Sequence, residues 1–169
     1  DLFPNASAGA AFDYLLITKG TLVTAFQPLV SQKTAAGLSV KTETVENITS
    51  SHTGRDVAEK VRNYIRHAYT NWGITYVLLG GDTDILPARY GYSSFGDPTE
   101  RDIPCDAYFA CLDGNWNRNG NAYWGEAAIS VSDPGDSTDF YAEVFIGRAP
   151  ASTTSDVTAF VNKITSYEN

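Results

Sequence analysis

Short apolar segments alternate with amphipathic helical segments along the first half of the chain, and this alternation limits the fold more than any other feature. Residues 13–18 and 74–82 are apolar runs, as expected of strands that are buried on both faces. Residues 21–37 and 54–73 place apolar side chains at helical spacing, and residues 38–45 alternate in the manner of a strand near a sheet edge. This order predicts a parallel sheet with right-handed crossovers.

The second half of the chain extends the same pattern. Residues 106–112 and 142–150 predict a fourth and a fifth strand, and residues 152–169 predict a closing helix. An Asn-rich loop and the turn-rich residues 130–139 lie between these two strands. We therefore expect an α/β fold of three layers, with a mostly parallel sheet between helices and a β-rich loop excursion. Residues 1–169 are expected to form it as one domain.

Two kinds of residue should interrupt or end the predicted helices. Pro28 should kink or restart the first helix, because proline lacks the backbone N–H that a helix interior uses. Gly37 and Gly73 are the expected stops, since glycine readily adopts the left-handed conformation found just after a helix.

Composition excludes several classes of protein. The net charge is −8 with 12 Lys and Arg residues, which argues against a protein that tracks nucleic-acid phosphates. No apolar run approaches the roughly 20 residues of a membrane span. The low lysine content and the many Tyr, Trp, Asn and Thr residues favour a secreted or cell-surface protein.

Residues 111–126, CLDGNWNRNGNAYWGE, carry oxygen-bearing side chains at alternate positions. Ca²⁺ takes about six to eight oxygen ligands, and a short loop supplies them by alternating ligands with spacers. The loop is not an EF-hand, because Arg118 and Trp124 stand where that motif has Gly and Glu. The other interpretation is a polar hairpin end, since Asn and Gly suit turns. The candidate metal ligands are Asp113, Asn115, Asn117, Asn119, Asn121 and Glu126.

The sequence offers no credible pair of nucleophile and base. Cys105 and Cys111 flank a segment read as a strand, which would hold them about 20 Å apart. That distance excludes a disulfide and predicts two free, largely buried thiols. His52 precedes the main helix and His67 lies off its apolar face, so both are interpreted as solvated. No catalytic residue is assigned.

A weaker interpretation concerns the carboxyl ends of the strands, where open α/β sheets bind ligands. Asp82 and Asp84 follow the third predicted strand and could hold magnesium in a receiver-like or nucleotide-binding domain. No glycine-rich phosphate loop accompanies them. The alternative is a strand-to-loop turn in which Arg89 or Arg148 neutralises Asp82. Arg148 is expected to be a structural residue and not a substrate ligand, with the loop aspartates Asp82 and Asp106 gathered near it.

Three segments, YVLLGGDTDILPARY, DAYFACLDG and EVFIGRAP, resemble in this order the gingipain-type cysteine peptidases of the caspase-like clan. The resemblance covers nearly the whole chain. It implies a catalytic unit of two side-by-side α/β subdomains, of which this chain is similar to the N-terminal, non-catalytic one. The catalytic Cys and the catalytic His, in a His-Gly loop, are then expected in a second subdomain, C-terminal to residue 169.

The resemblance also bears on the Asn-rich loop, because related loops carry aspartates at the alternate positions. Each Asn in place of Asp removes a charge but keeps a carbonyl oxygen, so weak Ca²⁺ binding is expected. The implied function is a structural subdomain of a secreted gingipain-like endopeptidase that is inactive alone. Protein or peptide substrates would be reached through the catalytic subdomain of the same polypeptide. The alternative is a free-standing calcium-dependent binding or surface module.

Overall fold

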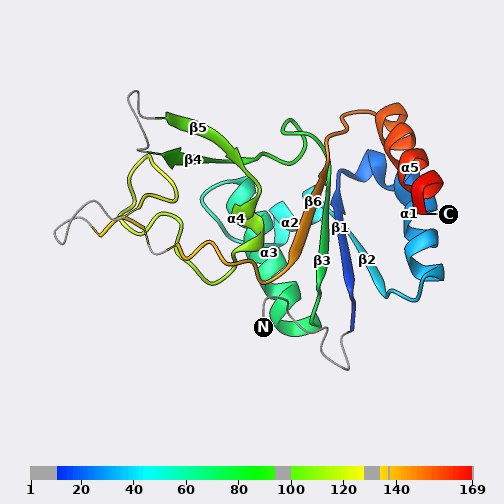
Figure 1. Cartoon of the computed structure of the whole chain (residues 1–169), viewed down its shortest axis with the longest axis horizontal. Coiled ribbons are helices and arrows are strands. Elements are labelled where there is room, and N and C mark those ends of the chain that lie inside the picture. Colours follow the sequence, from blue (N-terminus) through cyan, green and yellow to red (C-terminus); the bar gives the residue numbers. More distant parts are fainter. Residues whose placement is uncertain (1–10, 94–99, 128–133, 137, 169) are drawn as a thin grey trace.

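A four-stranded parallel sheet forms the centre of the protein (Figure 1). The computed structural model describes residues 11–93, 100–127, 134–136 and 138–168. The strands lie in the order β2-β1-β3-β6 and pair in parallel throughout. Their bounds are β1 Tyr14–Thr18, β2 Val40–Thr44, β3 Tyr76–Gly80 and β6 Phe145–Ala149. The predicted mostly parallel sheet is confirmed, and β2 lies at an edge as expected.

Helices cover both faces of the sheet, which completes the predicted three layers (Figure 1). A 3₁₀ turn at Gly20–Leu22 leads into α1, Val23–Ala35, which packs beside α5, Thr154–Glu168. The helices α2, α3 and α4 lie on the opposite side. Their bounds are α2 Val45–Ser51, α3 Val57–Trp72 and α4 Ala107–Ala110.

The core lies where the two central strands meet α1 and α3. Leu15 and Ile17 of β1, Leu79 of β3 and Ile65 of α3 have no exposed surface. Gly80 shows how closely the layers approach, because a Cβ there would lie 2.9 Å from the ring of Phe26. A side chain at this position would force helix and strand apart.

The ends of the helices follow the sequence in most places. The Asp56 carboxylate caps α3 by accepting the backbone N–H of Glu59 at 2.8 Å, and Gly73 ends this helix with φ of 72°. Gly37 also has a positive φ, just after α1. The predicted restart at Pro28 is wrong, because α1 continues through it. The short helix α2 was not predicted; Thr44 caps it through Asn47.

The largest error concerns residues 106–112, which form a short helix and not a strand. The segment Tyr108–Leu112 is fully buried and therefore uninterruptedly apolar, as is a strand in the middle of a sheet that is covered on both faces. A short buried run has no periodicity that separates helix from strand. The strand that pairs with β3 on its free side is β6. The residues predicted as a fourth strand form α4, which packs against α3.

A separate antiparallel hairpin supplies the β-rich excursion. It consists of β4, Arg89–Ser93, and β5, Glu100–Cys105, and it projects from one end of the main sheet (Figure 1). The sequence placed the excursion later, at residues 130–139, of which 130–133 and 137 lie outside the described residues.

Arg148 of β6 ties α4 to the loop that follows β3. Its guanidinium donates two hydrogen bonds of 2.7 Å to Asp106 and two further bonds to the carbonyls of Gly81 and Leu86, at 2.9 and 2.7 Å. Arg89 pairs with Asp56 instead, so neither arginine neutralises Asp82. Arg148 is therefore structural, as predicted, and of the two expected partners it binds Asp106 and not Asp82.

Replacement of Arg148 should destabilise the fold strongly. In Arg148→Ala the Asp106 carboxylate and two carbonyls lose their hydrogen-bond donors. We expect the free energy of unfolding to fall by about 3 kcal/mol. This is the lower end of the range for buried pairs, because the Asp106 side chain is 30% exposed. Thermal melts would measure this as a drop of several degrees or more. Lys41→Ala, which removes a loose 3.9 Å pair with Glu43, should cost under about 0.5 kcal/mol. Equal melting points for both variants would contradict this role.

Candidate functional site

Glu126 is the centre of the Asn-rich loop. The residue is 9% exposed, and its Oε2 accepts hydrogen bonds from the side-chain amides of Asn119 at 3.0 Å and Asn121 at 2.6 Å. No cationic side chain among the described residues forms an ion pair with it. The positive ends of two amide dipoles therefore balance a largely buried negative charge.

Three of the four asparagines also bend the loop onto itself. The Oδ1 atoms of Asn115, Asn119 and Asn121 each accept the backbone N–H two residues ahead, at 3.1, 3.0 and 2.7 Å. These are the local bonds that make asparagine common in turns. The polar-turn interpretation thus describes much of the loop.

Asn117 differs from the other asparagines. The residue is 5% exposed and its side-chain amide donates to the carbonyl of Asn121 at 2.9 Å, while its Oδ1 is buried and has no hydrogen-bond partner among the described residues. A buried oxygen that lacks a donor is costly, and an ion or water commonly supplies the missing partner. This oxygen is the feature of the loop that fits a cation.

Asp136 closes the loop, and the sequence did not single it out. Its carboxylate accepts the backbone N–H groups of Arg118 at 2.6 Å, Gly125 at 2.9 Å and Glu126 at 3.2 Å. The side chain is 8% exposed. Three charge-assisted bonds thereby join the two ends of the loop. Its only signal in the sequence was its place in a turn-rich stretch.

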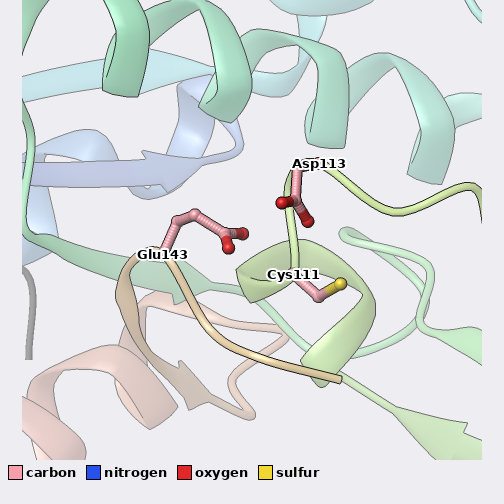
Figure 2. A group of neighbouring side chains, drawn as sticks. All are labelled: Cys111, Asp113 and Glu143. Carbon is pink, nitrogen blue, oxygen red and sulfur yellow. The ribbon is translucent and has the colours of Figure 1, made fainter. Parts of the chain in front are cut away.

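Asp113 lies with a different group of side chains, Cys111 and Glu143 (Figure 2). One potential ligand atom from each of the three lies within 4.8 Å of the others. Figure 2 shows the two carboxylates facing each other, from the segment after α4 and the segment before β6. Glu143 also accepts the backbone N–H of Leu112. The structure thus divides the six predicted ligands between two neighbouring clusters.

Both cysteines are free, as predicted, although the reason differs. The chain between them turns through α4 and is not extended. Cys111 is buried, and its thiol donates to Asp139 at 3.5 Å. Burial is the largest effect and raises the pKa of this thiol; the indole of Trp116 and the Gly114 N–H oppose it, and Asp139 adds a smaller upward effect. Cys111 is therefore a protonated thiol at neutral pH.

The two histidines belong to a cluster of aromatic rings. His52 packs edge-on against Tyr64 and His67 against Trp72, with ring centroids 5.0 and 5.5 Å apart. The two imidazoles lie 5.8 Å from each other. Their recorded hydrogen bonds in the described part of the chain are with Ser51 and Asn71, and none joins either histidine to a cysteine.

Asp82 and Asp84 do not converge at the carboxyl ends of the strands. Asp82 accepts the backbone N–H of Thr83 at 2.7 Å, and Asp84 accepts the Ser152 hydroxyl at 2.9 Å. Asp84 lines a pocket of about 260 Å³ with Lys19 and Glu46, but Asp82 does not. These contacts favour the strand-to-loop turn over a magnesium or nucleotide site.

Comparisons with known proteins give a consistent family. The sequence model of peptidase family C25 matches residues 7–169. No curated protein sequence matches the chain. In the described residues no helix has the length and apolar character needed to cross a membrane.

Solved structures of larger proteins share the fold. The Arg-specific cysteine proteinase gingipain R (RgpB) is 22% identical with a TM-score of 0.64, over 97% of this chain and 30% of that one. The complex of Porphyromonas gingivalis RgpB pro- and mature domains gives 23% and 0.63, over 92% and 29%. Dimeric latent PorU from the same organism gives 18% and 0.65, over 93% and 16%. The chain thus spans less than a third of each.

The two thiols should differ in reactivity. Cys105 is half-buried, whereas Cys111 is buried with a raised pKa, and the thiolate is the form that alkylates. Brief treatment of the native protein with iodoacetamide should modify Cys105 first, and unfolding in denaturant should expose both. Peptide mass spectrometry would check this order. Faster labelling of Cys111, or a disulfide between the two, would contradict the structure.

Proposed function

Because the chain belongs to peptidase family C25, we propose that it is the non-catalytic N-terminal subdomain of a secreted, gingipain-like cysteine endopeptidase. The observation that carries this proposal is the chemistry around Cys111. A cysteine nucleophile needs an accessible thiolate and a nearby base, usually an imidazole. Cys111 instead is buried beside a carboxylate, which disfavours the thiolate.

The remaining candidates support the same conclusion. His52 and His67 contact one another and the rings of Tyr64 and Trp72, and in the described part of the chain no hydrogen bond joins either to a carboxylate that could orient a catalytic base. Cys105 ends β5, and no described contact joins it to a histidine. On this proposal the catalytic Cys and His belong to another subdomain of the same polypeptide. Protein and peptide substrates bind there.

The pure chain should not cleave peptides. We would incubate it with a mixed fluorogenic peptide library under reducing conditions with Ca²⁺, beside Cys111→Ala and Cys105→Ala. Because no base activates either thiol, all three proteins should give the buffer rate. Turnover that disappears in one cysteine variant would overturn the proposal. Joining the chain to its natural C-terminal continuation should restore turnover. If that longer protein is also inert, the free-standing binding module is favoured.

The Asn-rich loop supports a second function, weak binding of one Ca²⁺ ion. The observation in its favour is the buried, unpartnered Asn117 Oδ1 in the same loop as Glu126, which is largely buried and forms no ion pair within the described residues. An arriving ion would take these oxygens, and the amides of Asn119 and Asn121 would turn their oxygens toward it. Fewer anionic ligands give a lower Ca²⁺ affinity, so binding in the millimolar range is expected, as in extracellular modules.

Calcium should stabilise the folded chain slightly. At ten times Kd an ion that binds only the folded state adds about 1.4 kcal/mol, which corresponds to a few degrees in Tm. Magnesium should do less, because it gives up its water reluctantly. Glu126→Gln should remove the response. Asn121→Asp should lower stability in chelator, by repulsion from Glu126, and enlarge the gain with calcium. Thermal melts in EDTA and in about 10 mM CaCl₂ measure both.

Asp113→Asn is the matched control, since it removes one negative charge from the neighbouring cluster. An unchanged calcium response limits the site to the loop, whereas a lost response would restore Asp113 as the ligand that the sequence predicted. Identical wild-type melts in EDTA and calcium would show that the loop is a polar turn.

A further inference from the structure

We propose that Cys111, Asp113, Asp139 and Glu143 form a binding site for a divalent ion of the zinc class, separate from the Asn-rich loop. The four side chains come from the segment after α4 and the segment before β6. They offer one sulfur and three carboxylate groups. The group is drawn without Asp139 in Figure 2.

The geometry brings three of the four donors to nearly the spacing of a metal site, with the fourth, Asp139, beside the sulfur. Potential ligand atoms of Cys111, Asp113 and Glu143 lie within 4.8 Å of one another, and Asp139 Oδ1 lies 3.5 Å from the Cys111 sulfur. Tetrahedral zinc has bonds of about 2.3 Å to sulfur and about 2.0–2.2 Å to carboxylate oxygen. Donor atoms around such an ion therefore lie between about 3 and 4 Å apart. Small rotations of exposed side chains close the remaining gap.

The charges of the cluster are not balanced by ion pairs. Among the described residues no ion pair includes Asp113, Asp139 or Glu143. Two neighbouring arginines bind backbone oxygens: Arg62 donates to the carbonyls of Cys111 and Gly114, and Arg66, which lines the same pocket as Asp113 and Glu143, donates to that of Leu112. These arginines hold the ligand-bearing segment in place and leave the carboxylates available.

A second, independent observation points at the sulfur. Trp116 is 2% exposed, and within the described residues its buried indole N–H makes no contact short enough to count as a full hydrogen bond. This N–H is close enough to the Cys111 thiol to lower its pKa, as is the backbone N–H of Gly114. A protonated thiol is a weak acceptor, whereas a metal-bound thiolate accepts N–H donors readily. Both N–H groups thus favour the thiolate against the larger effect of burial, and a bound metal ion would supply the remaining stabilisation.

The site is open to ions from solvent. Asp113 and Glu143 line a pocket of about 320 Å³ together with Arg66, Tyr69, Thr70 and Leu112. Asp113 and Asp139 are exposed, whereas the sulfur lies at the buried end. An ion can therefore meet the carboxylates first and the thiol last.

The donor set selects the type of ion. Thiolate favours zinc and related borderline ions, whereas Ca²⁺ and Mg²⁺ prefer oxygen alone. On binding, the Cys111 S–H bond breaks, the proton goes to solvent, and sulfur donates its electron pair to the ion. No electron transfer is involved. The ion would tie the segment that carries Asp139 and Glu143 to the end of α4.

Cobalt(II) provides the test, because thiolate bound to Co²⁺ absorbs in the near ultraviolet. The chain, purified in chelator and reductant and then freed of both, would be titrated with Co²⁺ and back-titrated with Zn²⁺. We expect a thiolate–cobalt band that Zn²⁺ displaces. Cys111→Ser should lose the band, and Cys105→Ser should keep it. Glu143→Gln can still accept the Leu112 N–H, so it should fold, yet it should raise the Kd for Co²⁺ at least about tenfold.

Two further variants separate this site from the Asn-rich loop. Asp113→Asn should weaken Co²⁺ binding and leave the Ca²⁺ response intact, and Glu126→Gln should do the reverse. Circular dichroism would confirm that each variant is folded. Absence of the band in folded wild-type protein, its survival in Cys111→Ser, or its loss in Cys105→Ser would overturn the proposal.

Discussion

The arrangement of both clusters depends on one buried guanidinium. Arg62 is 5% exposed, rises from the middle of α3, and donates to the carbonyls of Tyr108, Cys111 and Gly114. These carbonyls belong to a segment with few backbone partners of its own, because α4 has only four residues. Burial lowers the pKa of Arg62, but the charge is kept by the carbonyl oxygens around it. The Tyr108 ring, 5.1 Å from the guanidinium, adds a cation–π contact.

The periodic spacing of apolar residues made the main sheet and its large helices predictable. Segments without such spacing, such as α4, could not be predicted. Strands β1 and β3 are apolar because both faces are covered, and α3 has one continuous apolar stripe. The segment that contains α4 is apolar for the same reason as β3, yet Arg62 takes up carbonyls that would otherwise need a sheet neighbour. A hydrogen bond between residues far apart in the chain does not change the local spacing of apolar residues. The sequence pattern therefore could not distinguish a helix from a strand in this segment.

The candidate sites show a similar limit. Alternating oxygens marked the loop correctly as a unit, because Asn119 and Asn121 do meet Glu126. The spacing of the ligands could not show that Asp113 lies beside Cys111 and Glu143 and not with the other predicted ligands. Glu143 is about thirty residues further along the chain, so no local pattern connects it with Asp113. The role of Asp136 could not be predicted from the sequence either. It accepts backbone N–H groups, which every residue except proline carries, so no residue type marks its partners.

The position of β6 has a consequence for the order in which the protein assembles. Strand β1 pairs with β2 across a single helix, a nearby contact that forms early at small entropic cost. Strand β6 pairs with β3 across a long intervening segment that contains the hairpin, α4 and the Asn-rich loop. Closing this long segment costs more entropy, so we expect this pairing to form last in the sheet. Glu143 and Asp139 arrive on the chain that leads into β6. A nascent or partly unfolded molecule therefore possesses a sheet and a core before Asp139 and Glu143 can reach Cys111 and Asp113.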